Sequence, residues 1–202
     1  ALVGWHIEWK HLQPNTIEES IAFFHKAGLK NVIIPCLGGK WGIGHTPSEE
    51  SEERWNEYLE QIEMIRSRLE KECICLGYHN HEHEFQICYG NQCLFNKLYQ
   101  TMNPKIIMEL DTGNAIEGGA DPVRICSSIQ DRRIFLHCKP YSRKNGFDVM
   151  LGDKRDDNRW EQIALQAREK CEWFIIESES NVADELENAQ KCIDNLKIRL
   201  NL

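Results

Sequence analysis

The stretch KIIMELDTGNAIEGGADPVRICSSIQDRRIFLHCK, residues 105–139, contains the pattern that decides the fold of this chain. Two β-rich runs, 105–111 and 133–139, enclose an amphipathic stretch of helical character at 122–129. Parallel neighbouring strands need a helical crossover between them, so this order predicts a parallel βαβ unit.

The same unit repeats along the whole chain. The predicted strands are residues 2–9, 31–36, 73–80, 105–111, 133–139 and 172–179, and the predicted helices are 16–27, 51–71, 94–102, 122–129, 160–170 and 182–200. No linker or low-complexity tract interrupts them, so we expect a single α/β domain over residues 1–202. The first strand runs into Trp9-Lys10-His11-Leu12, and GxxxxGK[ST] is absent, which excludes a nucleotide-binding fold with a glycine-rich phosphate loop.

Composition narrows the class of protein further. The formal net charge of −8 argues against a nucleic-acid partner, because phosphate binding relies on clustered lysine and arginine. The absence of a long uncharged apolar run argues against a membrane-spanning protein. The nine cysteines are odd in number and mostly lie in or beside apolar runs, so we expect reduced thiols. The N-terminus lacks signal-peptide features, which together with the reduced thiols predicts a cytoplasmic protein.

Five of the six predicted strands end in two polar residues of the same parity. These pairs are His6 and Glu8, His79 and His81, Glu109 and Asp111, His137 and Lys139, and Glu177 and Glu179. Side chains two apart on a strand point to one face, and the carboxyl edge of a parallel sheet is where ligands bind. In a barrel these residues would surround one pocket. Their carboxylates and imidazoles suit a divalent cation such as Mn, Zn, Co, Fe or Mg.

Several motifs in the same order resemble one family of barrels. They are LGYHNHEHEF at 76–85, ELDTGN at 109–114 with GGADP at 118–122, HCK at 137–139, LGD at 151–153 with Trp160, and WFIIE at 173–177. Together they resemble the xylose isomerase-like TIM-barrel superfamily, in its sugar phosphate isomerase/epimerase branch. The resemblance implies an α/β fold of (β/α) TIM-barrel type with about six of eight βα units, beginning at the family's third strand. Such a barrel has an open edge, so we expect either that the sequence is a fragment lacking the first two units or that a partner or swapping covers the edge, as in a homo-oligomer.

The resemblance also implies a set of site residues. The divalent metal ion (Mn, Zn, Co or Mg) would be held by His79, Asp111, His137 and Glu177. The catalytic residues would be Glu177, as both ligand and base, with Lys139 and His81. The substrate would meet His6, Glu109, Asn114 and Glu179, and Glu179 or Glu109 are alternatives for the base.

The implied function is a metal-dependent sugar or polyol isomerase or epimerase-type enzyme, which moves a proton next to a carbonyl through an enediolate. Three departures from the family pattern weaken epimerisation: His79 replaces a common Glu, Asn114 replaces a His, and Pro140 replaces an Asp. An inosose-dehydratase-like lyase, and a non-catalytic barrel remnant that binds a sugar or a partner, therefore stay open. An endonuclease-IV-like phosphodiesterase is disfavoured by the net charge.

Overall fold

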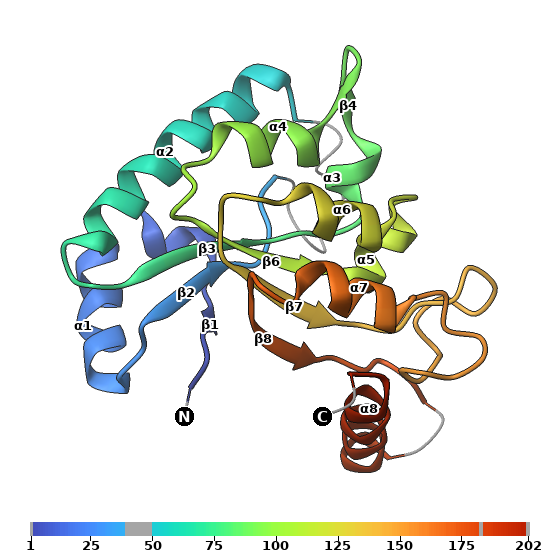
Figure 1. Cartoon of the computed structure of the whole chain (residues 1–202). Coiled ribbons are helices and arrows are strands. Elements are labelled where there is room, and N and C mark those ends of the chain that lie inside the picture. The colour runs from blue at the N-terminus through green and yellow to red at the C-terminus, as the bar shows by residue number, and fades with distance from the viewer. Residues whose placement is uncertain (1, 39–49, 182–183, 201–202) are drawn as a thin grey trace. The chain divides into compact units, whose positions relative to one another are not determined.

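The structure is a computed structural model that describes residues 2–38, 50–181 and 184–200 (Figure 1). The chain divides into two compact units, Ala1–Met108 and Glu109–Leu202, each with its own strands and helices. Strand β6 (Ile107–Asp111) contributes its first two residues to the first unit and its last three to the second.

The strands of the first unit follow each other in hydrogen-bonded order, β1-β2-β3-β6. Their bounds are β1 (Trp5–His6), β2 (Asn31–Ile34) and β3 (Cys75–His79). Both β1–β2 and β2–β3 are parallel, with Ile33 opposite Gly77. A Cβ on Gly77 would lie 2.4 Å from the side chain of Ile33 and 3.2 Å from the carbonyl of Ile107, so only glycine lets these strands approach so closely.

Helices and one hairpin complete the first unit. They are the 3-10 helix η1 (Trp9–Leu12), α1 (Ile17–Ala27), α2 (Glu52–Glu70), α3 (His83–Gln86), the hairpin of β4 (Cys88–Tyr89) and β5 (Gln92–Cys93), and α4 (Leu94–Thr101). The side chain of Ser51 caps α2 by accepting from the amide of Arg54 at 3.2 Å. Phe24, Trp55 and Leu69 are fully buried and form part of the core of this unit.

The second unit alternates strands and helices in the same manner. Its elements are the end of β6, α5 (Thr112–Glu117), α6 (Pro122–Ser128), β7 (Ile134–Cys138), α7 (Trp160–Ala167), β8 (Cys171–Ile176) and α8 (Glu185–Leu200). Strands β7 and β8 are parallel, with His137 opposite Ile175. Every residue of β7 is buried. Ile134 and Leu136 lie on one face of the strand, and Phe135 and His137 lie on the other, so both faces are covered.

All six predicted strands and all six predicted helices are present, although the strands are shorter than predicted. Strand β1 ends at His6, so Glu8 does not share its face. Instead, Glu8 is exposed and pairs with Lys10 at 2.6 Å. Helices α3 and α5 were not predicted, because they are too short to show a period, and the β4–β5 hairpin was not predicted either. The single domain over residues 1–202 stays a prediction.

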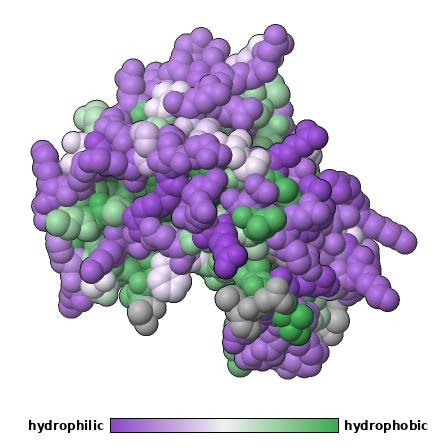
Figure 2. All heavy atoms as spheres, viewed as in Figure 1, coloured by the Kyte–Doolittle hydropathy of each residue, from purple (hydrophilic) through white to green (hydrophobic). Residues whose placement is uncertain are grey.

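Polar side chains cover most of the visible surface. Figure 2 shows a largely hydrophilic face with smaller apolar patches between the polar side chains. On α8, Leu186 and Ile198 are 83% and 72% exposed. Among the helices of the described residues, we find none with the length and apolar character needed to cross a bilayer.

Candidate active site at the carboxyl ends of the strands

In the second unit, His137 lies between two carboxylates that come from the neighbouring strands. Its Nδ1 is 3.4 Å from Oδ2 of Asp111, the last residue of β6, and 3.2 Å from Oε2 of Glu177, which follows β8. The backbone explains why Asp111 points this way. Its Oδ1 accepts from the amide of Asn114 at 2.7 Å and caps α5, which turns Oδ2 toward His137.

Lys139 extends the cluster by one residue beyond β7. Its Nζ is 3.0 Å from Oε1 of Glu177 and 2.5 Å from Oε1 of Glu179, and it lies 4.3 Å from the ring centre of Phe147. Lys139 is buried, whereas about one third of the Glu177 side chain and half of the Glu179 side chain are exposed. The ammonium therefore connects the buried cluster to the solvent-facing side of the site.

The surrounding acids decide the protonation of the two basic groups. Burial by itself lowers the pKa of His137, but the hydrogen bond and charge of Asp111, with the charges of Glu109 and Glu177, outweigh it and raise the pKa above its ordinary value. Burial also opposes the charge on Lys139, yet its bond to Glu179 and the charges of Asp111 and Glu177 leave the pKa of Lys139 raised. Lys139 is thus a cation at neutral pH, suited to donate a hydrogen bond and not to act as a base.

The donor set of this cluster fits a divalent cation. Three carboxylates, Asp111, Glu177 and Glu179, act on the ammonium of Lys139, and the charge of Glu109 acts on His137. These four negative charges and one positive charge leave an excess of three negative charges when His137 is neutral. With metal–ligand bonds of about 2.1 Å, neighbouring donors in a tetrahedral or octahedral shell lie about 3.0–3.4 Å apart. The observed separations of 3.4 and 3.2 Å from His137 to the two carboxylates match these edges.

The long loop after β7 supports Lys139 through Asp156, whose carboxylate holds several groups of the loop by hydrogen bonds. Asp156 was not among the predicted site residues. This carboxylate accepts bonds from the indole of Trp160 at 2.6 Å and from the amide and side chain of Asn158, both at 3.0 Å. Asn158 in turn donates to the backbone carbonyl of Lys139 at 3.1 Å. The signal available in the sequence was the motif LGD…W, whose tryptophan is one of these donors.

The first unit contributes a row of imidazoles at the end of β3. The ring centres of His6 and His79 are 5.0 Å apart, those of His79 and His81 are also 5.0 Å apart, and His81 stacks on His83 at 5.8 Å. His79 and His83 are buried, His81 is half-buried and His6 is exposed. Strand β3 ends at His79, so His81 lies in the loop and not on the strand.

Glu84 holds that loop in place and was not among the predicted site residues. Its side chain is completely buried, at 0% exposure. Oε1 accepts from the hydroxyl of Tyr78 at 2.6 Å and lies 3.0 Å from Nε2 of His83, while Oε2 accepts from the amide of His81 at 2.8 Å. Burial opposes the charge of Glu84, but the bonds from His83 and Tyr78 keep its pKa below the ordinary value. The Glu84 of LGYHNHEHEF is therefore a structural anion.

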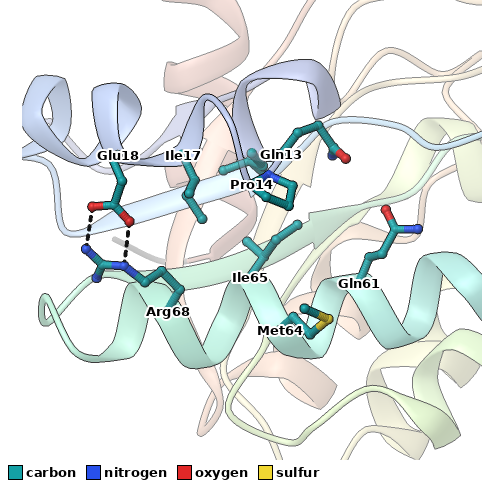
Figure 3. Close-up of a pocket in the computed structure, with 9 residues that line it drawn as sticks. Gln13, Pro14, Ile17, Glu18, Gln61, Met64, Ile65 and Arg68 are labelled. Carbon is teal, nitrogen blue, oxygen red and sulfur yellow. Dashed lines mark hydrogen bonds and ion pairs between the residues drawn. The ribbon is translucent and has the colours of Figure 1, made fainter.

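The first unit also has an apolar pocket, which lies apart from these residues. It has a volume of about 190 Å³ and is lined by side chains of the η1–α1 segment and of α2, including Ile17, Met64 and Ile65 (Figure 3). The ion pair between Arg68 and Glu18 closes one end, at 2.6 and 2.8 Å. None of the predicted site residues lines this pocket, so it is not the candidate active site.

The predicted site residues thus separate into two groups. The second unit brings together Glu109, Asp111, His137, Lys139, Glu177 and Glu179, and it places Asn114 on α5 beside Asp111. The first unit brings together His6, His79 and His81. The role of His79 as a ligand to the same metal as the second group stays a prediction.

Comparison with solved structures identifies the fold. A sugar phosphate isomerase/epimerase from Parabacteroides distasonis superposes with a TM-score of 0.72 at 18% identity, over 92% of this chain and 66% of that one. An L-ribulose 3-epimerase gives 0.65 at 13% identity, over 93% and 66% of the two chains. The fold is that of a partial TIM barrel. A xylose isomerase domain protein from Planctomyces limnophilus agrees, with a TM-score of 0.59 at 16% identity over 94% and 68% of the two chains.

The likeness confirms the predicted fold class at the level of structure. The chain spans just under two thirds of the length of the first two of these proteins. No protein-family model and no curated protein matches the sequence. The activity of the chain is therefore argued from its own residues.

Proposed function

We propose that this chain belongs to a metal-dependent sugar or polyol isomerase or epimerase-type enzyme that transfers a proton next to a carbonyl. The observation that supports the proposal is the position of His137 between Asp111 and Glu177, at the carboxyl ends of three successive strands. The solved structures of similar fold include proteins described as a sugar phosphate isomerase/epimerase and an L-ribulose 3-epimerase, which favours a sugar as substrate.

The metal ligands in this proposal are Asp111, His137 and Glu177, with His79 as the fourth. A bound divalent cation would supply Lewis-acid stabilisation of the negative charge that develops on the substrate oxygens during enolisation. Mn, Zn, Co and Mg all accept such carboxylate and imidazole donors.

The chain's own residues carry the proton. Glu177 is partly exposed and accepts from Lys139, so its carboxylate can reach a substrate C–H while its orientation is held. Lys139, kept protonated by the acids around it, donates to a substrate oxygen. His81, together with His6, Glu109, Asn114 and Glu179, would then complete the substrate contacts.

A lyase of the inosose-dehydratase type is the second candidate. It is favoured by the residues at the end of β3, where His79 and His81 stand and no carboxylate takes the position of the common family Glu. Two-sided proton exchange needs a base on each face of the substrate, whereas removal of a proton followed by loss of water needs one main base.

Metal binding is tested first, with purified chain and Mn, Co, Zn and Mg. We expect at least one cation to raise the melting temperature, and Glu177→Gln to weaken its binding by at least about tenfold. Glu169→Gln, at an exposed position of the same unit, is the matched control and should bind as wild type. Equal affinity in the Glu177 variant, or no effect of any cation on wild type, would refute the metal site.

Proton transfer is tested by deuterium incorporation from D₂O into ketoses and keto-cyclitols, followed by NMR. Exchange at the carbon next to the carbonyl, lost in Glu177→Gln and kept in Glu169→Gln, supports the isomerase. Loss of water from the substrate identifies the lyase instead. Binding of a sugar with no exchange and no elimination would show a non-catalytic barrel remnant and contradict both enzymes.

A further inference from the structure

The hairpin that follows α3 places two cysteines directly opposite each other. Strands β4 and β5 are antiparallel, and Cys88 pairs with Cys93 while Tyr89 pairs with Gln92. Gly90 and Asn91 form the two-residue connection that follows the strand labelled β4 in Figure 1. Gly90 has φ 61°, and a positive φ at the first central position is what a type II′ hairpin turn requires.

The hydrogen bonds identify the kind of pair that the cysteines form. The amide of Leu94 donates to the carbonyl of Ile87 at 2.8 Å, so Ile87 and Leu94 are a hydrogen-bonded pair. Hydrogen-bonded and non-hydrogen-bonded pairs alternate along an antiparallel ladder, which makes Cys88 and Cys93 a non-hydrogen-bonded pair. Such pairs have Cα atoms about 4.5 Å apart and the closest Cβ atoms of the ladder. A disulfide accepts Cα separations of about 4.4–6.8 Å, so this pair can be bridged without moving the backbone.

The two thiols are also accessible. Both are reduced in the structure, with Cys88 exposed and Cys93 half-buried. Cys126, Cys138 and Cys192, by contrast, are buried. We propose that Cys88 and Cys93 are a redox modification site, at which a hydroperoxide or a small-molecule disulfide reversibly closes a disulfide across the hairpin.

The chemistry balances with a hydroperoxide as the oxidant. The thiolate of Cys88 attacks the peroxide, the O–O bond breaks, and Cys88 becomes a sulfenic acid while water or an alcohol leaves. The thiolate of Cys93 then attacks that sulfur, an S–S bond forms, and the sulfenic oxygen leaves as water. With a small-molecule disulfide, the thiolate of Cys88 attacks one sulfur and releases one thiolate, and the thiolate of Cys93 then displaces the second as the S–S bond forms. The two electrons lost by the thiols reduce the peroxide, and a dithiol reductant reverses the reaction.

The position of the pair shows what the bond would hold. Cys93 is the residue that precedes α4. Ile87 is the residue that follows α3, and its amide donates to the carbonyl of His83 at 2.9 Å. The rings of Phe85 and Phe95 stack between these two helices at 4.5 Å. A bond between Cys88 and Cys93 therefore joins the end of α3 to the start of α4. This inference does not depend on the proposed enzymatic activity.

The test uses the full chain, exposed to increasing hydrogen peroxide or glutathione disulfide and then blocked with an alkylating reagent. Cleavage with trypsin and a glutamate-specific protease releases residues 85–97, which contain only these two cysteines, and residues 73–82, which contain Cys73 and Cys75. The second peptide is an internal control, because Cys73 is exposed but has no cysteine opposite it in a ladder.

We expect peptide 85–97 to appear unalkylated and about 2 Da lighter than its dithiol form, at an oxidant dose at least about tenfold below that which blocks Cys73. Dithiothreitol should restore alkylation, and Cys93→Ser should abolish the intramolecular bond. Alkylation of both Cys88 and Cys93 at doses that already oxidise Cys73 would overturn the proposal. A bond from Cys88 to a second copy of the chain would overturn it as well.

Discussion

Replacing Glu84 with glutamine removes a negative charge from the interior of the first unit while keeping the size of the side chain. Three groups face its two oxygens: the hydroxyl of Tyr78 at 2.6 Å, the amide of His81 at 2.8 Å and Nε2 of His83 at 3.0 Å. Glutamine offers one acceptor oxygen and one NH₂ group. In the place of Oε2 the NH₂ group meets the amide of His81, and in the place of Oε1 it meets His83, which donates while it is protonated.

The expected destabilisation follows from these contacts. Removing one partner of a buried ion pair costs about 3–5 kcal/mol, and the buried donor left without an acceptor accounts for about 1–3 kcal/mol of that cost. With a urea m-value of about 2–3 kcal/mol per molar, the unfolding midpoint of Glu84→Gln should fall by about 1–2.5 M.

Urea unfolding followed by circular dichroism measures this change. Glu60→Gln, at an exposed position of α2 in the same unit, is the matched control and should lie within about 0.5 kcal/mol of wild type. A loss below 1 kcal/mol for Glu84→Gln would refute the reasoning, because it would mean that the charge of Glu84 contributes nothing to its contacts.

Two further predictions concern pH and packing. Burial opposes the charge of His83, but the bond to Glu84 outweighs it and raises the pKa of His83. The resulting stabilisation of the fold is complete below about pH 6.5 and is lost as the pH rises through the raised pKa. The lowered pKa of Glu84 stabilises the fold above about pH 4.5, and this contribution is lost as the pH falls through the lowered pKa. The difference in the free energy of unfolding between wild type and Glu84→Gln should therefore be largest between about pH 4.5 and pH 6.5. Urea titrations at several pH values measure this difference, and a difference that does not change with pH would contradict the prediction. Gly113→Ala would place a Cβ 2.8 Å from the carbonyl oxygen of Lys139, so we expect the free energy of unfolding, measured by thermal unfolding, to fall by about 1–3 kcal/mol. Gly4→Ala is the control and should be near-neutral, because its Cβ would meet nothing closer than 3.5 Å.

Much of the fold could be predicted from local pattern. The alternation of β-rich and amphipathic runs identified every long element, because periods of 2.0 and 3.6 residues are visible within one segment. The hairpin at 88–93 was missed, although its Gly90-Asn91 connection is a hairpin signal in the sequence. Helices α3 and α5 have four and six residues, which is too short for a period to show.

The candidate site could be predicted only in part. The residues of the second cluster were identified by their parity at the strand ends, and Asp111, His137, Lys139 and Glu177 do lie together. Glu8 was included by the same rule and lies elsewhere, because pairing with β2 stops at His6.

The sequence by itself determined the order of the elements and the kinds of side chain that stand where strands end, since both depend on residues close together in the chain. Only the tertiary structure decided that Glu84 is clamped by Tyr78 and His81, and that Asp156 supports Lys139 through Asn158. The reason is physical. A buried carboxylate is stabilised by whichever donors the packing brings to it, and in this fold those donors come from a strand end, a loop and a helix that no periodic pattern connects.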